Sequence, residues 1–441
     1  MKKIFISDIL GFDVNNSVDI SGWIKSKQDL GGTIFVLLED STGFIQVVVK
    51  DNIVAEDKFQ KLKALKPESA IRVVGVLKEG KNKAHEIEAK DVEVIGEALI
   101  SIEPSPRSNF DLFDKKYVNI NLSKRHLYLR NKKMMSVLRF KSNFLYSMHE
   151  WFNKRGFVFI DAPVITQTLL YDDSMAFPID FFGTKMFLSQ CVAFQLEAAV
   201  HGFEKVYNIT PSFRAEKSRT NRHLAEYWHL KAEVAFADLD DMKKFAEEVL
   251  YETLKSAMER SSKEIEEFEN AIDINDIKPP YKSITYDEAI DLVQSKGSKI
   301  EWGASLGADE EKILSEDMKK PVFVKGIPCS AESFPFKKDS SNEKETRTED
   351  LIAPNGFGEV LGVAEKICDK QQLLDRMKEK GRETPEELER YRWYIELRDY
   401  GCVPHSGLGA GIDRIVRWAL GIENIRNTIS FPRAYGRVPY P

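Results

Sequence analysis

Charged side chains of both signs crowd the stretch "SFRAEKSRTNRHLAEYWHLKAE", residues 212–233. A solvated amphipathic helix is one interpretation of such a run. However, the flanks alternate apolar and polar residues, which is typical of strands. Two antiparallel strands joined by a cationic loop predict a clamp for a polyphosphate. Arg214 can present a planar fork to one phosphate, and Arg222 and His223 supply further donors. Tyr227 offers a ring face on which a purine could stack.

Two further stretches carry residues suited to nucleotide chemistry. "HSGLGAGIDRIVRWALGIENIR" has small residues that let a backbone approach a ligand closely, and Arg414 follows near the start of a predicted helix. The "GLGAG" run alone is as common in a packed turn as in a nucleotide site. In "EDLIAPNGFGEVLG", Asp350 and Glu359 are hard oxygen ligands that could hold Mg²⁺ against phosphates. A pair of carboxylates at this spacing is also common on ordinary surfaces.

The first hundred residues predict a small closed barrel. "VDISGWIKSK", "GGTIFVLLEDSTGFIQVVVK", "AIRVVGVLKEG" and "KDVEVIGEALI" read as strands, with "DLGG" and "DSTG" as turns and "EDKFQKLKAL" as a helix. Strands with one helix in the middle are the pattern of an OB-fold. "SIEPSPRSNFD" then supplies the prolines and serines of a linker.

The remainder alternates helices and strands. "MMSVLRFKSNFLYSMHEWFNKRG" has helical apolar spacing and ends at Gly156, "FVFIDAPVIT" reads as a strand broken by Pro163, and "PVFVKGIP" reads as a buried strand. The sequence therefore predicts an α+β protein in three parts. These are a barrel domain over 1–103, a hinge or linker over 104–130 and a sheet domain with flanking helices over 131–441.

The bulk composition excludes several classes of protein. No window approaches the roughly 18 apolar residues of a membrane span, and the start of the chain lacks the apolar core of a signal peptide. The four cysteines are far apart and form no CxxC pair, which argues against a zinc site and predicts a reducing cytoplasm. The net charge is −6. A basic stripe from Arg107 to Lys141 could nevertheless contact the phosphates of a nucleic acid.

Taken together, these stretches resemble the class II aminoacyl-tRNA synthetases, specifically the asparaginyl family. "GFVFIDAPVIT" resembles class motif 1, which builds the dimer interface, "FRAEKSRTNRHLAEYW" resembles motif 2, and "GLGAGIDRIVRWALGIENIRNTISFPR" resembles motif 3. "DLIAPNGFGEVLG" and "WYIELRDYGCVPHSG" are similar to the asparaginyl rather than the aspartyl signature. The match runs in order along nearly the whole chain.

The resemblance implies a class II antiparallel-sheet catalytic domain and roles for individual residues. It implies ATP and Mg²⁺ as cofactors, with the metal on Asp350 and Glu359. Arg214 would contact the α-phosphate, where charge builds as a carboxylate attacks. The other ATP-binding residues would be Glu216 at the adenine end, Tyr227 on the ring, and Arg222, His223 and Arg414 on the outer phosphates, with Arg214 and Arg414 as the catalytic pair.

The resemblance also implies partners. It predicts a homodimer that binds tRNA and an amino acid or another carboxylic acid. The front domain would read the anticodon, with Phe35 stacking on a base and Gln46 hydrogen-bonding to it. A core phenylalanine and a surface glutamine would be the ordinary interpretation of these two residues.

The predicted acid pocket departs from the family pattern. By resemblance it would contain Ala193, Glu197, Lys231, Glu233, Lys366 and Arg398. Ala193 stands where the family has a glutamine, and Lys231 stands where it has an acidic residue facing the substrate's α-ammonium group. Lys366 replaces an arginine that faces the side chain, and a lysine cannot supply the same bidentate fork. A misplaced residue in the alignment, or compensation by Gln190 and Gln195, would also account for the difference.

Three hypotheses follow. The first is ATP-dependent adenylation of an asparagine-like carboxylate and its transfer to tRNA. The second is a paralogue with a rebuilt pocket that adenylates another acid and passes it to tRNA or to another nucleophile. The third is a catalytically silent RNA-binding protein, which the complete set of phosphate-binding residues disfavours. The identity of the acid, the tRNA and the pathway stay open.

Overall fold

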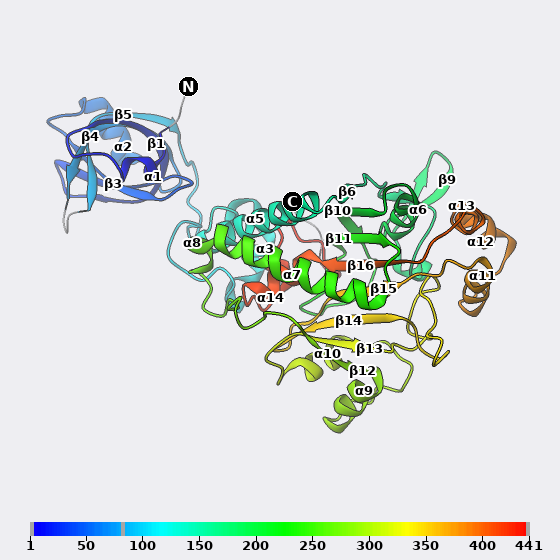
Figure 1. The fold of residues 1–441 in the computed structure, drawn as a ribbon. Coiled ribbons are helices and arrows are strands. Elements are labelled where there is room, and N and C mark those ends of the chain that lie inside the picture. Colours follow the sequence, from blue (N-terminus) through cyan, green and yellow to red (C-terminus); the bar gives the residue numbers. More distant parts are fainter. Residues whose placement is uncertain (1–3, 81–83, 438–441) are drawn as a thin grey trace. The chain divides into compact units, whose positions relative to one another are not determined.

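The computed structural model describes residues 4–80 and 84–437, and the chain forms two compact units (Figure 1). One unit contains Met1–Asp114 and Leu127–Lys132, and the other contains Lys115–His126 and Lys133–Pro441. The α+β class is confirmed. The boundaries 1–103, 104–130 and 131–441 stay a prediction.

The smaller unit is a closed five-stranded barrel in the order β1-β2-β3-β5-β4. Helix α2 (Glu56–Ala64) connects β3 to β4, as the sequence predicts for an OB-fold. A short helix, α1 (Ile6–Ile9), precedes the barrel. The barrel strands are β1 (Ser17–Asp29), β2 (Thr33–Glu39), β3 (Phe44–Lys50), β4 (Ala70–Glu79) and β5 (His85–Gly96).

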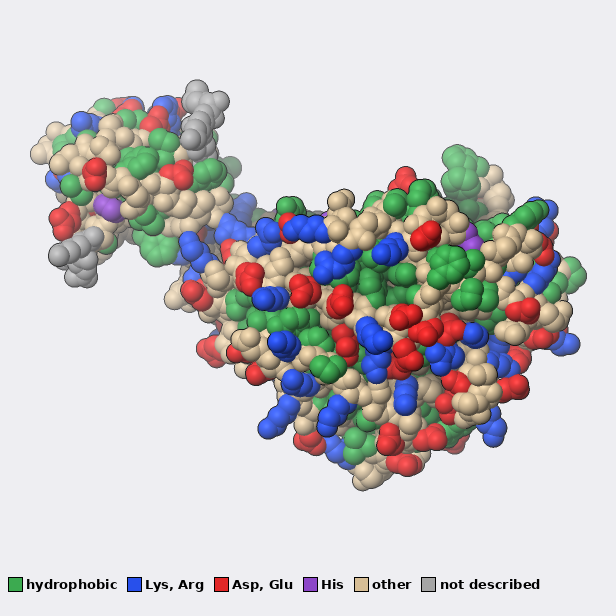
Figure 2. Space-filling model, in the orientation of Figure 1, with side chains coloured by type: hydrophobic (Ala, Val, Ile, Leu, Met, Phe, Trp, Pro, Cys, Tyr) green, Lys and Arg blue, Asp and Glu red, His purple; other side chains and the backbone are tan. Residues whose placement is uncertain are grey.

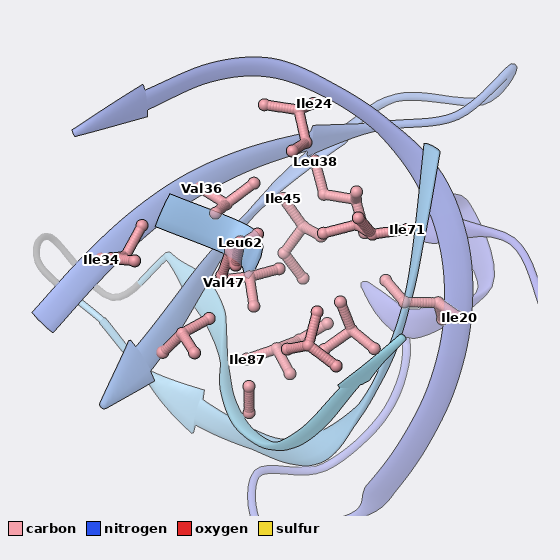
Figure 3. Packing of buried hydrophobic residues seen from close by; sticks show 14 of the residues in the cluster. Ile20, Ile24, Ile34, Val36, Leu38, Ile45, Val47, Leu62, Ile71 and Ile87 are labelled. Carbon is pink, nitrogen blue, oxygen red and sulfur yellow. The ribbon is translucent and has the colours of Figure 1, made fainter. Parts of the chain in front are cut away.

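Alternate residues of the strands fill the barrel. Ile34, Val36 and Leu38 of β2 are fully buried, while the residues between them face outward. Figure 3 shows these side chains pointing inward to meet Ile45 and Val47 of β3. Fully burying one such aliphatic side chain stabilises a fold by about 1.5–3 kcal/mol, so the core specifies the register of each strand.

The basic stripe predicted from Arg107 to Lys141 is not a continuous basic surface. Arg107 is buried, and its guanidinium binds the carboxylates of Glu68 and Glu39 at 3.0 and 2.7 Å. Lys141 is buried in the other unit against Asp413 at 2.5 Å. These cations neutralise internal carboxylates and are not available to the phosphates of a nucleic acid. The prediction was wrong for Arg107 and Lys141, because the number of charged residues along a stretch of sequence does not reveal which of them are buried.

The larger unit is built on an eight-stranded sheet in the order β12-β13-β14-β15-β16-β11-β10-β6. The pairs β12–β13 and β10–β6 are parallel, and the other neighbours are antiparallel. The strands are β6 (Val158–Phe159), β10 (Lys205–Phe213), β11 (Glu226–Ala235), β12 (Lys282–Thr285), β13 (Val322–Lys325), β14 (Thr348–Ala353), β15 (Gly358–Glu365) and β16 (His405–Gly411).

The stretch around Pro163 divides as the sequence predicts. β6 joins the large sheet, whereas β7 (Ile165–Thr166) joins a separate three-stranded sheet with β8 (Pro178–Phe181) and β9 (Thr184–Leu188). A proline within a strand lacks the N–H that the ladder needs, so the chain leaves the large sheet there.

Helices cover the large sheet. α7 (Leu239–Arg260) packs on β15 and β16, and α6 (Ala193–Phe203) packs on β10 and β11. α5 (Lys132–Lys154) ends before Gly156, whose φ of +76° suits a glycine. The remaining helices are α3 (Val118–Ser123), α4 (Arg125–Tyr128), α8 (Ser262–Ile265), α9 (Tyr286–Ser295), α10 (Ala308–Ser315), α11 (Lys370–Glu379), α12 (Pro385–Arg390), α13 (Arg392–Glu396) and α14 (Ile412–Ala419). In the part of the chain that the structure describes, none of the helices is long and apolar enough to cross a membrane.

Candidate active site

One face of the large sheet forms the floor of a cavity of about 260 Å³. Alternate residues of β11 line it, because successive side chains of a strand point to opposite faces. They are Tyr227, His229, Lys231 and Glu233. The strand therefore runs along the cavity and carries a different chemical group at each step.

Glycines keep the floor of the cavity open. Gly407 and Gly409 of β16 pair with Glu233 and Lys231 of β11. A Cβ atom at either glycine would collide with the end of the facing side chain. The "GLGAG" run is thus a strand whose missing side chains make room for its neighbours and for a ligand.

Arg214 lies directly after β10, at the aromatic end of the cavity. Its guanidinium is 4.6 Å from the Tyr171 ring and 5.8 Å from the Tyr227 ring, and it approaches Glu216 at 3.4 Å. Burial disfavours its charge, but Tyr227, Tyr171 and Glu216 hold the pKa of Arg214 above its usual range. Its buried Nε has no partner among the described residues. A permanent cation with a free donor is suited to binding a phosphate.

Arg222 forms an ion pair that the sequence did not indicate. Its guanidinium binds the buried carboxylate of Glu311 in α10 through two contacts, of which Nη2 to Oε1 is 2.8 Å. Glu311 Oε2 also accepts from the backbone N–H of Glu359 at 2.5 Å. The two contacts with Glu311 leave Arg222 Nε without a partner among the described residues, so a contact with an outer phosphate would have to use the remaining N–H groups. Nothing in the helical pattern of α10 distinguishes Glu311 from its acidic neighbours.

His223 lies among polar groups of the loop. Its Nδ1 is 3.0 Å from Ser218 Oγ and contacts Thr220 Oγ1, and its Nε2 is 3.5 Å from Glu216. Burial and the nearby Arg414 lower the pKa of His223 to about 4. The imidazole is therefore neutral at pH 7 and can act only as a hydrogen-bonding group.

Arg414, the third residue of α14, reaches Glu359 across the cavity. Its Nη1 lies 2.8 Å from Glu359 Oε2 and 3.2 Å from the Glu359 carbonyl oxygen. Burial raises the pKa of Glu359, but Arg414 and Arg222 outweigh it and bring the pKa to about 2. The carboxylate is therefore ionised at physiological pH.

Asp350, Glu359 and Glu332 form a carboxylate cluster on the cavity wall. Burial and the charge of Glu359 raise the pKa of Asp350 well above its usual range, and burial raises that of Glu332 as well. Asp350 takes part in no ion pair or side-chain hydrogen bond with the described residues. Oxygen donors that repel one another are the set that a hard divalent cation stabilises. The sequence predicted Asp350 and Glu359 here, but it carried no signal for Glu332.

Lysines and carboxylates meet at the inner end of the cavity. Lys366 Nζ lies between Glu233 at 3.3 Å and Glu197 at 3.6 Å. Glu197 is completely buried, and it binds Arg398 at 3.0 Å and accepts from Tyr394 at 2.6 Å. Lys231, Glu233 and Lys366 line the cavity.

Three residues predicted for the acid pocket do not line the cavity. Glu197 and Arg398 lie behind Lys366, where they hold it in place. Ala193 is the first residue of α6, is 1% exposed and packs in a core cluster with Phe194 and Phe334. Aligning the sequence by position did not reveal that Ala193 is buried, because its burial depends on how α6 packs.

In the barrel, Phe35 and Gln46 lie on the outer face of neighbouring strands. Phe35 pairs with Val48, and Gln46 pairs with Leu37, so the two residues are diagonal neighbours. Gln46 is exposed, and its amide donates to Glu86 at 2.9 Å. The positions agree with the predicted base-binding role, which stays a prediction.

Two family models match this chain. A model of the tRNA synthetases class II (D, K and N) matches residues 117–435, and a model of the OB-fold nucleic acid binding domain matches residues 18–95. The asparagine–tRNA ligase of Pyrococcus furiosus is 36% identical over the full length of both chains. That of Chloroflexus aurantiacus is 34% identical over 97% of each chain.

Solved structures show the same likeness. The crystal structure of asparaginyl-tRNA synthetase from Pyrococcus horikoshii, complexed with asparaginyl-adenylate, matches all of both chains with a TM-score of 0.92 and 36% identity. The Entamoeba histolytica enzyme with the same adenylate matches with a TM-score of 0.87 and 26% identity, over 100% of this chain and 99% of the other. The chain therefore belongs to the class II aminoacyl-tRNA synthetases, in the asparaginyl-tRNA synthetase family.

Proposed function

We propose that this protein is an ATP-dependent ligase that adenylates an asparagine-like carboxylic acid and transfers it to tRNA. The observation that supports this most directly is the arrangement of Arg214, Arg414 and the carboxylate cluster around one cavity. Asparagine is the first acid to test, because the relatives just described are named as asparagine–tRNA ligases.

The aromatic end of the cavity would hold ATP. Tyr227 would stack on the adenine ring, and Glu216 would meet its edge. Arg214 would bind the α-phosphate, with its unpartnered Nε as a free donor. His223, Arg414 and Arg222 would bind the outer phosphates, Arg222 through the N–H groups that its pair with Glu311 leaves without a partner.

The carboxylate cluster fits Mg²⁺. Asp350 and Glu359 would hold the ion, with Glu332 beside them, because their oxygens match its ligand preference and their mutual repulsion needs a cation. When bound, the ion would supply positive charge to the phosphates.

The reaction needs positioning rather than acid–base chemistry. A carboxylate oxygen of the acid attacks the α-phosphorus, an O–P bond forms, and the P–O bond to pyrophosphate breaks. No proton is transferred in this step. Arg214 would stabilise the charge that builds on the α-phosphate, and the cavity would hold the reactants in line.

Two further parts of the proposal concern partners. The outer barrel face with Phe35 and Gln46 would bind the tRNA anticodon. A second copy of the chain would pack on the edge strand β6, where Val158 and Phe159 are 37% and 44% exposed. The cytoplasm as the place of action stays a prediction.

The experiment is ATP–pyrophosphate exchange with each amino acid in turn, followed by acylation of total tRNA. We expect exchange with an acid of asparagine size that depends on Mg²⁺, and acylation of one tRNA family. If no acid supports exchange while tRNA still binds, the protein is a silent RNA-binding protein instead. If exchange occurs but tRNA is never acylated, the acceptor is another nucleophile.

A further inference from the structure

The ammonium group of Lys231 faces the cavity, and the carboxylate of Glu233 is close enough to favour its charge without forming an ion pair with it. Its side chain extends over Gly409 and is only half-buried. The Lys231 side chain forms no ion pair and no hydrogen bond with the residues that the structure describes. Its neighbours Lys366 and Glu233 bind each other at 3.3 Å, so Glu233 is already shared with another cation.

Asp350 is the acidic group across the floor from Lys231. Gly409 and Gly362 are paired residues of β16 and β15, and a Cβ at Gly362 would lie 2.6 Å from Asp350 Oδ1. The two charged groups thus lie over adjacent glycines, but they do not form an ion pair. If Asp350 holds Mg²⁺, as proposed above, it is not available to neutralise Lys231.

The position of Lys231 on β11 places it where the acid must lie. Tyr227 lies at the proposed adenine end, and Glu233, six residues further along the strand, lies about 20 Å away. Lys231 is between them. Lys366 and Arg214 disfavour its charge, whereas Glu233 favours it. Lys231 in turn favours the ionised form of Asp350. An acid whose carboxylate reaches the α-phosphate beside Arg214 therefore lies over Lys231.

The charge of Lys231 determines which group the substrate can carry next to its reacting carboxylate. An ammonium group about 4 Å from another cation, at an effective dielectric near 20, loses about a thousandfold in affinity. A carboxylate, hydroxyl or carbonyl oxygen would instead accept a hydrogen bond from Lys231. Burial lowers the pKa of Lys231, and an anionic ligand would favour its charged form.

The following inference rests on the proposed adenylating function. We propose that Lys231 donates a hydrogen bond to an acceptor group of the substrate. The acid is then of amino-acid size and carries a carboxylate, hydroxyl or carbonyl oxygen, rather than an ammonium, beside the carboxylate that attacks ATP. The bonds made and broken are those of the adenylation step, and the acceptor group stays unchanged.

The test compares acids that differ only at this position. ATP–pyrophosphate exchange is measured with asparagine, with 2-hydroxysuccinamic and 2-oxosuccinamic acids, which carry a hydroxyl or a carbonyl oxygen in place of its amino group, and with succinamic acid, which carries only hydrogen there. We expect at least one of the acids without an amino group to exceed asparagine in kcat/KM by tenfold or more. Lys231→Glu should reverse that order, lowering exchange with the preferred acid at least tenfold and raising it with asparagine.

Two further variants control for the fold. Lys231→Gln removes the charge without adding a new one, and it should reduce the preference without reversing it. Lys255→Glu makes the same charge reversal at an exposed site on α7 and should leave the preference unchanged. Thermal denaturation establishes that each variant is folded. If Lys231→Glu does not fold, the inference is tested by whether Lys231→Gln reduces the preference for acids without an amino group.

Two outcomes would overturn the inference, and they are distinguishable. Asparagine exceeding every acid without an amino group would contradict the assignment of Lys231 while leaving the adenylating function intact. Absence of exchange with every acid and every amino acid would remove the proposed function and this inference together.

Discussion

At the scale of single residues, the cavity combines permanent cations with groups whose charge depends on their surroundings. Arg214 lies between two tyrosine rings and stays charged. His223 is neutral because it is buried beside Arg414. Burial and the charge of Glu359 raise the pKa of Asp350 well above its usual range. The cavity therefore contains both cationic donors and carboxylate oxygens, and two of these groups, Arg414 and Glu359, already pair with each other.

Replacing Arg214 tests the phosphate assignment. Arg214→Ala should reduce kcat/KM for pyrophosphate exchange by about 100- to 1,000-fold, the usual effect of removing one preorganised donor. Arg214→Lys should recover only part of this, because a lysine keeps the charge but loses the planar fork. Arg392→Ala, at an exposed arginine on α13, is the control. Normal exchange by Arg214→Ala would remove Arg214 from the site.

His223 should contribute to the pH dependence of stability. Its pKa is about 4 in the folded protein and about 6.5 when unfolded. Between these values the unfolded chain binds a proton that the folded chain does not, so stability falls as pH decreases. His223→Asn removes this contribution. From pH 7 to pH 5, urea unfolding should show the wild type losing about 1–2 kcal/mol relative to the variant; parallel curves would contradict the lowered pKa.

At the scale of elements, one buried carboxylate joins three segments around the cavity. Asp413 of α14 binds Lys141 of α5 at 2.5 Å and accepts from the Trp228 N–H of β11 at 2.9 Å. Thr428 Oγ1 donates to it at 3.3 Å. These contacts fix the start of α14, and therefore Arg414, relative to the strand that lines the cavity.

Breaking this buried pair should be costly. Lys141→Met leaves the Asp413 charge buried without its cation, and we expect a loss of about 3–5 kcal/mol in the free energy of unfolding. Lys154→Met, on the same helix, removes an exposed pair with Glu150 and should cost less than about 1 kcal/mol. Urea denaturation of the two variants measures the difference. Equal effects would show that Lys141 is not structurally important.

At the scale of the whole molecule, the chain has separate units for two kinds of recognition. The barrel presents Phe35 and Gln46 on its outer face, and the larger unit encloses the cavity. On the face of the larger unit shown in Figure 2, Lys and Arg are interspersed with Asp and Glu. Binding of tRNA through the barrel should rest mainly on base stacking by Phe35.

Phe35→Ala tests this division of roles. Loss of one base stack should weaken tRNA binding by about 1–3 kcal/mol, while pyrophosphate exchange stays unchanged because the cavity is in the other unit. Binding should also decrease steeply with salt as counterions are released. Filter binding at several salt concentrations measures both effects. Ile95→Ala, at an exposed apolar residue of β5, is the control; equal loss in both variants would contradict the assignment of Phe35.

Much of the architecture could be predicted from local sequence. Alternating patterns indicated the barrel strands, β10 and β11, and the break at Pro163 separated β6 from β7. The stretches around Arg214, Asp350 and Arg414 indicated a nucleotide site, and the structure brings all three to one cavity. These features depend on residues close together in the chain, so local periodicity and motif spacing are sufficient to reveal them.

Only the tertiary structure decided which charges face the ligand. Arg222 pairs with Glu311, 89 residues away, and Lys141 pairs with Asp413, 272 residues away. Glu197 lies behind the cavity wall, whereas Lys231 lines the cavity and forms no ion pair with the residues that the structure describes. The reason is physical: a charge acts through burial and through neighbours a few ångströms away, and both are set by packing between distant segments. The sequence by itself determined the fold and the class of chemistry, and the packing of the sheet and its helices determined the charge that the acid meets.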